Sequence, residues 1–154
     1  MDVRRAAVKD FEALKEIKTE FFRWECEQDV MLDPAYVKRV LGMRLAKNLR
    51  QSNTVFVIAE EEGKAVGFAG AEIKKNGSDL KYRHQGHLFG IYVRPHHRRK
   101  GIAEKMLNEI MKWFKEKNID YLVLERWDHN KIAASLYRKF GYKDRLVSMV
   151  KSPN

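Results

Sequence analysis

The chain turns from a predicted strand into a predicted helix within the stretch Val93-Arg94-Pro95-His96-His97-Arg98-Arg99-Lys100-Gly101-Ile102-Ala103. The first turn of a helix carries backbone N–H groups that have no partner within the helix, and these groups bind anions. Gly101 and Ala103 have little or no side chain, so a phosphate can approach this backbone closely. The stretch therefore predicts a pyrophosphate site, flanked by four cationic residues: Arg94, Arg98, Arg99 and Lys100.

Two well-known phosphate loops do not match this stretch. A Walker loop ends in Gly-Lys-Ser/Thr, and a dinucleotide fingerprint needs three spaced glycines, whereas only Gly101 is present here. Taken alone, the pattern also fits a basic turn that joins a strand to a helix and binds no ligand.

Length and composition restrict the class of protein. The 154 residues suit a single domain over residues 1–154. With 34% charged residues, the chain has no apolar run that approaches a membrane span, and its charged N-terminus is unlike a secretory signal. Cys26 is the only cysteine, which excludes an intramolecular disulfide and a cysteine-based zinc cluster. We therefore expect a cytoplasmic protein with no membrane partner and no metal.

The formal net charge of +10 can attract nucleic acid, an anionic membrane or an anionic cofactor. Lysine and arginine are spread along the chain without a long block. A basic nucleic-acid-binding protein is therefore kept only as a less favoured alternative.

Periodicity and turn residues divide the chain into strands and helices. Apolar residues recur at helical spacing from Phe11 to Trp24, and Asp33-Pro34 is a typical helix start. Gly90 interrupts a predicted strand and indicates a bulge. This order predicts an α/β fold with a mixed, mostly antiparallel sheet of six to seven strands flanked by four helices. Strands are expected at residues 3–7, 54–59, 65–73, 86–93, 121–124 and 145–150, and helices at residues 11–24, 33–45, 101–114 and 130–140.

Two segments carry a family resemblance. Residues 98–103 fit Arg/Gln-x-x-Gly-x-Gly/Ala, and residues 130–142 fit Asn-x-x-Ala-x-x-Leu-Tyr-x-Lys-x-Gly-Phe/Tyr. Both resemble signature segments of the GNAT superfamily of N-acetyltransferases, whose order of elements is similar over nearly the whole chain. The resemblance implies the acyl-CoA N-acyltransferase fold, acetyl-CoA as co-substrate and an amine as acceptor.

The same resemblance implies how acetyl-CoA is held. In the family, the asparagine that corresponds to Asn130 and the helix after it contact the pantetheine and the sulfur of coenzyme A. The strand backbone that corresponds to residues 91–93 forms hydrogen bonds with the pantetheine amides. The expected cofactor-binding residues are Ile91, Tyr92, Val93, Arg98, Arg99, Lys100, Gly101, Ile102, Ala103, Glu104, Asn130 and Tyr137.

Acetyl transfer to an amine needs an acid and, for some amines, a base. The thiolate that leaves is readily protonated, and we expect the Tyr137 hydroxyl to do this. Without the resemblance, Tyr137 reads as a core aromatic residue. His87 lies where some histone-type relatives place a catalytic Glu, so it is the expected base. A structural imidazole is an equal alternative for His87. A backbone N–H beside Gly90 can stabilise the oxyanion.

The sequence says least about the amine that accepts the acetyl group. Glu25, Glu27 and Asp29 follow the first predicted helix, at the end where the helix dipole disfavours carboxylates, so we expect them to hold a cationic amine. A solvated helix end is the alternative. The amine can be a protein N-terminus, a lysine, a polyamine or another small amine. A non-catalytic CoA-binding regulatory module of the same fold is the second interpretation, and a homodimer is left open.

Overall fold

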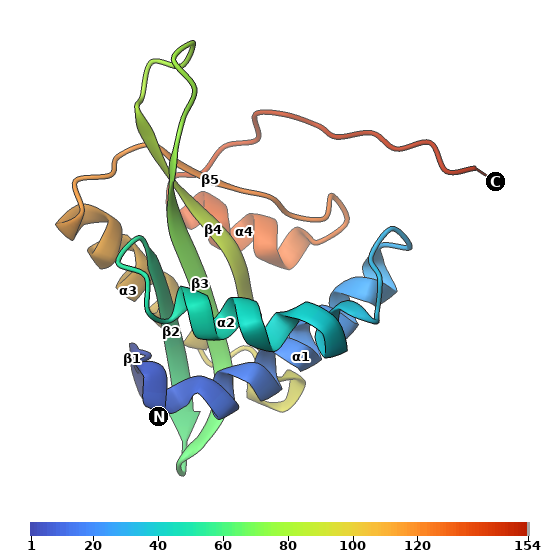
Figure 1. The fold of residues 1–154 in the computed structure, drawn as a ribbon, viewed down its shortest axis with the longest axis vertical. Helices are drawn as coiled ribbons and strands as arrows, with labels where there is room; N and C mark the ends of the chain where they lie inside the picture. Colours follow the sequence, from blue (N-terminus) through green and yellow to red (C-terminus); the bar gives the residue numbers. More distant parts are fainter. Residues whose placement is uncertain (154) are drawn as a thin grey trace.

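The computed structural model describes residues 1–153 and contains a central five-stranded sheet (Figure 1). The strands lie in the order β1 (Asp2–Arg5), β2 (Thr54–Glu61), β3 (Lys64–Lys75), β4 (His84–Val93) and β5 (Leu122–Leu124). All neighbours are antiparallel except β4 and β5, which are parallel. The predicted mixed, mostly antiparallel sheet is confirmed.

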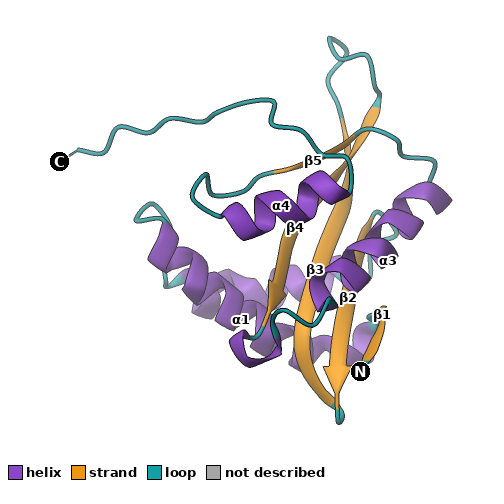
Figure 2. Ribbon diagram, turned by 180° about the vertical axis from the view of Figure 1, so that it is seen from behind, coloured by secondary structure: helices purple, strands orange, loops and turns teal. Residues whose placement is uncertain are grey.

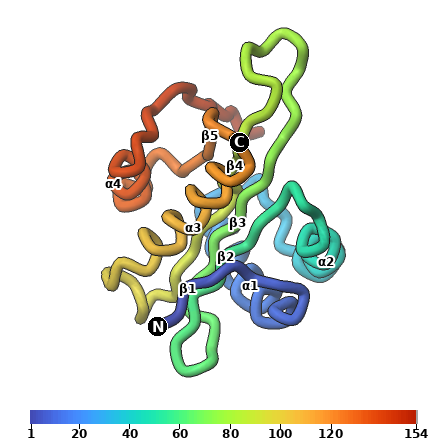
Figure 3. Tube along the Cα trace, turned by 90° about the vertical axis from the view of Figure 1, so that its left-hand side faces the viewer, coloured from blue at the N-terminus to red at the C-terminus, as the bar shows by residue number. Residues whose placement is uncertain are grey.

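Four α-helices cover the two faces of the sheet (Figures 2 and 3). One face packs against α1 (Phe11–Gln28) and α2 (Gly42–Asn48), and the other against α3 (Ile102–Glu116) and α4 (Lys131–Lys139). Three short turns of helix accompany them: η1 (Val8–Asp10), η2 (Val37–Leu41) and η3 (Pro95–His97). Each face has its own apolar cluster because the strands alternate their side chains between the two layers.

A bulge interrupts β4 at the predicted place. Gly70 of β3 lies opposite Gly90, but Ala71 lies opposite Leu88, so Phe89 is an extra residue without a partner on β3. Glycine suits the next position, because a Cβ on Gly90 would crowd the ring of Phe21 at 3.0 Å. The bulge turns Phe89 and Gly90 toward the α1 face.

The expected strand at residues 145–150 is wrong. In the described chain this segment forms no strand, and Leu146, Val147, Met149 and Val150 are 80–90% exposed. The sheet therefore ends at β5 and has five strands rather than six to seven. Apolar composition indicates that a segment can form a strand, but it does not supply the contacts with a partner strand that decide whether one forms.

The second predicted helix begins later than expected. Asp33 accepts a hydrogen bond from the backbone N–H of Ala35 at 2.9 Å and closes a turn instead of starting the helix. Helical backbone follows at η2, which is wound as a π-helix, and continues into α2.

A buried ion pair fixes the start of α1 to the sheet edge. Asp10 is 8% exposed and accepts hydrogen bonds from two Arg4 nitrogens at 2.8 and 2.9 Å, and from the Ala7 N–H at 2.7 Å. Arg4 also donates to Glu60 of β2. The hydrogen bonds from Arg4 lower the pKa of Asp10 from its usual 3.8 to about 2, although burial opposes this shift.

The pKa shift of Asp10 predicts how stability depends on pH. A lowered folded-state pKa stabilises the protein above the unfolded pKa, and this contribution is lost as the pH falls from about 4 to about 2. We expect Asp10→Asn to lower the free energy of unfolding by roughly 2 kcal/mol at pH 7, with the difference from wild type shrinking toward pH 2. Urea unfolding at several pH values measures this.

Asp2→Asn is the matched control, because Asp2 is 70% exposed and lies 3.9 Å from the same arginine. It should change the stability by less than about 1 kcal/mol. A difference for Asp10→Asn that stays the same from pH 7 to pH 2 would contradict the assignment to this ion pair.

Candidate functional site

The parallel pairing of β4 with β5 ends just before the bulge. Strand β5 pairs only with Gly86, His87 and Leu88, so the rest of β4 has no strand on that side. The backbone of Ile91, Tyr92 and Val93 therefore borders an opening between β4 and β5. An extended ligand can form strand-like hydrogen bonds along such an edge.

The loop after β4 leads directly to the N-terminus of α3. Arg99 and Gly101 both have left-handed backbone angles, with φ of 65° and 73°. Gly101 is the N-cap of α3, and no side chain caps it. A Cβ on Gly101 would meet nothing within 4 Å, so the junction is open. The N–H groups at residues 102–104 are thus available for an anion.

Two of the four predicted phosphate cations have other partners. Arg98 donates through Nε to the carbonyl of Val93 at 2.8 Å and lies over the ring of Tyr92, which braces the loop. Arg94 donates to Glu16 and Glu20 of α1 instead of facing the opening. Arg99 and Lys100 are exposed beside the start of α3 and form no ion pair among residues 1–153.

Helix α4 begins at Asn130, whose side chain accepts a hydrogen bond from the Ala133 N–H at 3.1 Å. Asn130 therefore has a structural role as a helix cap. Glu104, in the first turn of α3, accepts from Lys139 of α4 at 3.2 Å and joins the two helices.

Tyr137 of α4 is 7% exposed and belongs to the same apolar cluster as Leu88 of β4. Its ring meets Tyr142 edge to face, with centroids 6.0 Å apart. Burial raises the pKa of Tyr137 to about 12, so the phenol keeps its proton at neutral pH. Its hydroxyl forms no hydrogen bond within the described residues.

His87 bridges two carboxylates. Its Nε2 lies 2.6 Å from Glu125, and its Nδ1 lies 3.4 Å from Glu72 of β3. Both ring nitrogens thus have partners in this arrangement. Glu125 is 80% exposed and can move away, which would free Nε2.

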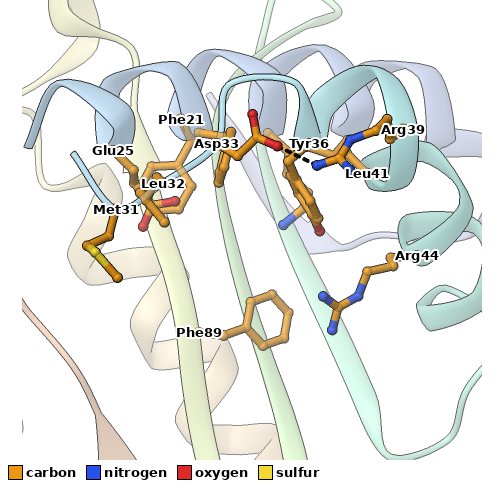
Figure 4. Close-up of a pocket in the computed structure, with 12 residues that line it drawn as sticks. Phe21, Glu25, Met31, Leu32, Asp33, Tyr36, Arg39, Leu41, Arg44 and Phe89 are labelled. Atoms are coloured by element: carbon orange, nitrogen blue, oxygen red, sulfur yellow. Dashed lines mark hydrogen bonds and ion pairs between the residues drawn. The ribbon is translucent and has the colours of Figure 1, made fainter. Parts of the chain in front are cut away.

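A pocket of about 440 Å³ lies on the other side of the bulge, between α1, η2 and β4 (Figure 4). Phe89, the extra residue of the bulge, forms part of its lining together with Phe21, Glu25 and Arg44. The pocket and the β4–β5 opening therefore meet β4 at the same place.

The three predicted acceptor carboxylates do not form one group. Only Glu25 lines the pocket, and burial raises its pKa to about 7. Glu27 is exposed, and Asp29 accepts a hydrogen bond from the Met31 N–H at 2.9 Å, which closes the turn after α1.

Sequence reasoning missed Lys18, which lies in the pocket lining. A signal was present, because Lys18 follows Leu14 by four residues and precedes Phe21 by three, which places it on the apolar face of α1.

Residues 1–153 contain no helix long and apolar enough to cross a membrane.

An N-alpha-acetyltransferase from Sulfurisphaera tokodaii has a similar sequence, with 33% identity over 103 residues. These residues are 64% of this chain and 62% of that relative, so the match spans less than two thirds of the relative's length.

Two solved structures have the same fold. The tetramutant of the BH1408 protein from Bacillus halodurans has a TM-score of 0.84 and 15% identity, with 99% of each chain covered. A Clostridium acetobutylicum protein described as a predicted acetyltransferase, solved with acetyl-CoA, has a TM-score of 0.75 and 23% identity, with 98% of this chain and 95% of that chain covered. At these identities, the likeness establishes the fold alone.

The strongest finding concerns the family. The model of the acetyltransferase (GNAT) family matches residues 11–142, a range that includes the α3 junction and all of α4. The chain belongs to the GNAT acetyltransferase family.

Proposed function

We propose that this protein is an acetyl-CoA-dependent N-acetyltransferase that transfers the acetyl group directly to an amine. The observation that carries the proposal is the half-paired end of β4, which runs straight into the uncapped N-terminus of α3. The free edge of β4 suits an extended pantetheine, and the N-terminus of α3 suits a pyrophosphate. Family membership and the acetyl-CoA bound to the Clostridium acetobutylicum protein support the same interpretation.

The residues present fit acetyl-CoA as a co-substrate. The N–H groups at residues 102–104, with Arg99 and Lys100 beside them, would hold the pyrophosphate. The backbone of residues 91–93 would hold the pantetheine along the free edge of β4. Arg98, Glu104 and Asn130 support this site through the loop, the α3–α4 contact and the cap of α4.

In the proposed reaction, a neutral amine attacks the thioester carbon from the pocket side of the bulge. A C–N bond forms, the carbonyl oxygen becomes an oxyanion near the bulge backbone, and the C–S bond then breaks. The Tyr137 hydroxyl donates its proton to the leaving thiolate. The extra proton of the amine passes to a base, for which His87 is the candidate once Glu125 moves away.

The need for a base depends on the acceptor. A lysine amine with a pKa near ~10.4 costs about 4–5 kcal/mol to deprotonate at pH 7, and an α-amine near ~8 costs about 1 kcal/mol. Of the predicted acceptor carboxylates, only Glu25 lines the pocket and would contact an amine there, whereas Glu27 and Asp29 would act only through their electrostatic field.

The proposal is tested by measuring thiol release from acetyl-CoA with a panel of amines, together with calorimetry of acetyl-CoA binding. Amine-dependent thiol release is the expected result. Tight binding of acetyl-CoA without thiol release for any amine would favour the non-catalytic CoA-binding module. Absence of binding would contradict both.

The pyrophosphate site predicts the effect of a charge at Gly101. Gly101→Asp places a carboxylate and a Cβ where the phosphate would lie. We expect the affinity for acetyl-CoA to fall at least about tenfold, or about 1.4 kcal/mol, as measured by calorimetry.

Gly63→Asp is the matched control. Gly63 has φ of 74°, close to the 73° of Gly101, and also has open space around its Cβ, but it lies in the turn between β2 and β3. Both variants carry the same backbone strain, so only Gly101→Asp should lose affinity. Equal affinities in the two variants would remove the basis for the pyrophosphate site.

The acid role predicts that Tyr137→Phe lowers kcat by at least about tenfold, because acid catalysis typically contributes ~10²–10⁴-fold. The ring still packs, so acetyl-CoA affinity should stay within about twofold. Steady-state kinetics and calorimetry measure the two quantities.

Tyr142→Phe serves as the control, since the Tyr142 hydroxyl is buried without a hydrogen-bond partner beside Tyr137. Its kcat should stay near that of wild type. A Tyr137→Phe variant with full kcat, under conditions where chemistry limits the rate, would rule out the acid role.

A further inference from the structure

Lys18 of α1 lies in a cage of three phenyl rings. Its Nζ is 4.8 Å from the ring centroid of Phe68, 5.3 Å from that of Phe89 and 5.4 Å from that of Phe56. The rings come from β3, the β4 bulge and β2, so all three central strands contribute. Such distances suit attraction between a cation and the faces of aromatic rings.

The Lys18 ammonium has no direct anionic partner among residues 1–153, and Glu25 acts on it only through its electrostatic field. Within residues 1–153 it forms no hydrogen bond and no ion pair, although it has three N–H donors. Arg44, which also lines the pocket, likewise has no hydrogen bond or ion pair in the described chain. Arg39 differs, because its guanidinium is paired with Asp33 (Figure 4).

The charges around the pocket therefore do not balance. Lys18 and Arg44 contribute two positive charges, and Asp33 cancels Arg39. Glu25 is the one remaining carboxylate among the lining residues, so the cations exceed the carboxylates by one, and burial raises the pKa of Glu25 to about 7, which weakens its charge further. The pocket therefore favours an anionic group of a ligand over a further cationic group.

A desolvated ammonium without a hydrogen-bond acceptor is costly for the folded protein. Burial lowers the pKa of Lys18 to about 8, with Glu25 opposing and Arg44 adding to the shift. The lysine still carries its proton in most molecules at pH 7. An apolar residue of similar length would avoid this desolvation cost, and a ligand that brings an anion beside the ammonium would offset it.

We propose that Lys18, together with Arg44, binds a carboxylate of the acceptor, so that the acceptors are amines with a nearby carboxylate, such as amino acids, rather than polyamines. The inference rests on the proposed function, because it assumes that the acceptor enters the pocket beside Phe89. Glu25, which lies across the pocket from Arg44 (Figure 4), then contacts the amine of the same molecule. An acceptor with both groups complements both signs of charge in the pocket.

The first experiment compares matched acceptors. L-Phenylalanine and phenethylamine differ only in the carboxylate, and kcat/KM is measured for each with wild type and Lys18→Met. We expect the ratio of the two kcat/KM values to favour L-phenylalanine in wild type and to fall at least about tenfold in Lys18→Met. Further pairs, L-leucine with isoamylamine and L-alanine with ethylamine, cover smaller side chains.

Lys15→Met is the matched control. Lys15 lies one turn earlier on α1, is exposed, and has its Nζ 5.8 Å from the ring of Phe11 outside the pocket. It should leave the ratio unchanged. Urea unfolding of Lys18→Met checks the fold, and we expect no loss of stability because a buried charge is removed. Arg44→Gln should lower the ratio in the same direction.

A second experiment does not depend on catalysis. Calorimetry compares binding of N-acetyl-L-phenylalanine and N-acetylphenethylamine to wild type and Lys18→Met. Tighter binding of the first compound by wild type only is the expected result. Binding of this kind without any acetylation would support the carboxylate site and contradict the proposed function.

If the protein acetylates amines, but the ratio of kcat/KM for L-phenylalanine to that for phenethylamine is the same in wild type and Lys18→Met, the proposed function is supported and the carboxylate site is overturned. A protein that neither acetylates the panel nor binds either compound would contradict both.

Discussion

The bulge in β4 is the constraint on which the rest of the site depends. One extra residue, Phe89, shifts the register of β4 against β3, and the β5 ladder stops one residue earlier, at Leu88. On one side of the sheet, the remainder of β4 is left with a free edge. On the other side, Phe89 turns into the pocket and Gly90 lets the ring of Phe21 approach. A regular strand would close the opening and would remove Phe89 from the pocket lining.

The parts of the site that were predicted from sequence depend on local backbone chemistry. Glycine is favoured at position 101, where the backbone is left-handed, and at position 90, where an aromatic ring packs against the strand. Both residues could therefore be singled out from the sequence. The helices were predicted because their apolar faces repeat at helical spacing. The order of these elements, rather than any long-range contact, was sufficient for the fold class.

The parts that were missed depend on contacts between distant residues. Residues 145–150 have the apolar composition of a strand, but in the described chain they pair with no strand of the sheet. Arg94 lies in a basic run, yet its partners Glu16 and Glu20 are more than seventy residues earlier in the chain. Lys18 reads as an ordinary charged helix residue until β2, β3 and β4 each place a phenyl ring around it.

The ion pairs of Arg94 hold the loop that leads to α3 in a fixed position relative to α1, which lines the pocket. Arg94 begins the loop that leads to α3, and it donates twice to Glu20 and once to Glu16, one turn apart on α1. A two-point contact between a guanidinium and a carboxylate fixes orientation as well as distance.

Lys18 lies between these two glutamates in sequence but faces the sheet, so the same helix is attached to the loop on one side and lines the pocket on the other. Direct transfer requires the amine and the thioester to be held within a few tenths of an ångström of a reactive separation. An α1 that moved independently of the loop would separate them. The positive charge at Arg94 is therefore more useful to the proposed reaction as a clamp on α1 than as another phosphate ligand.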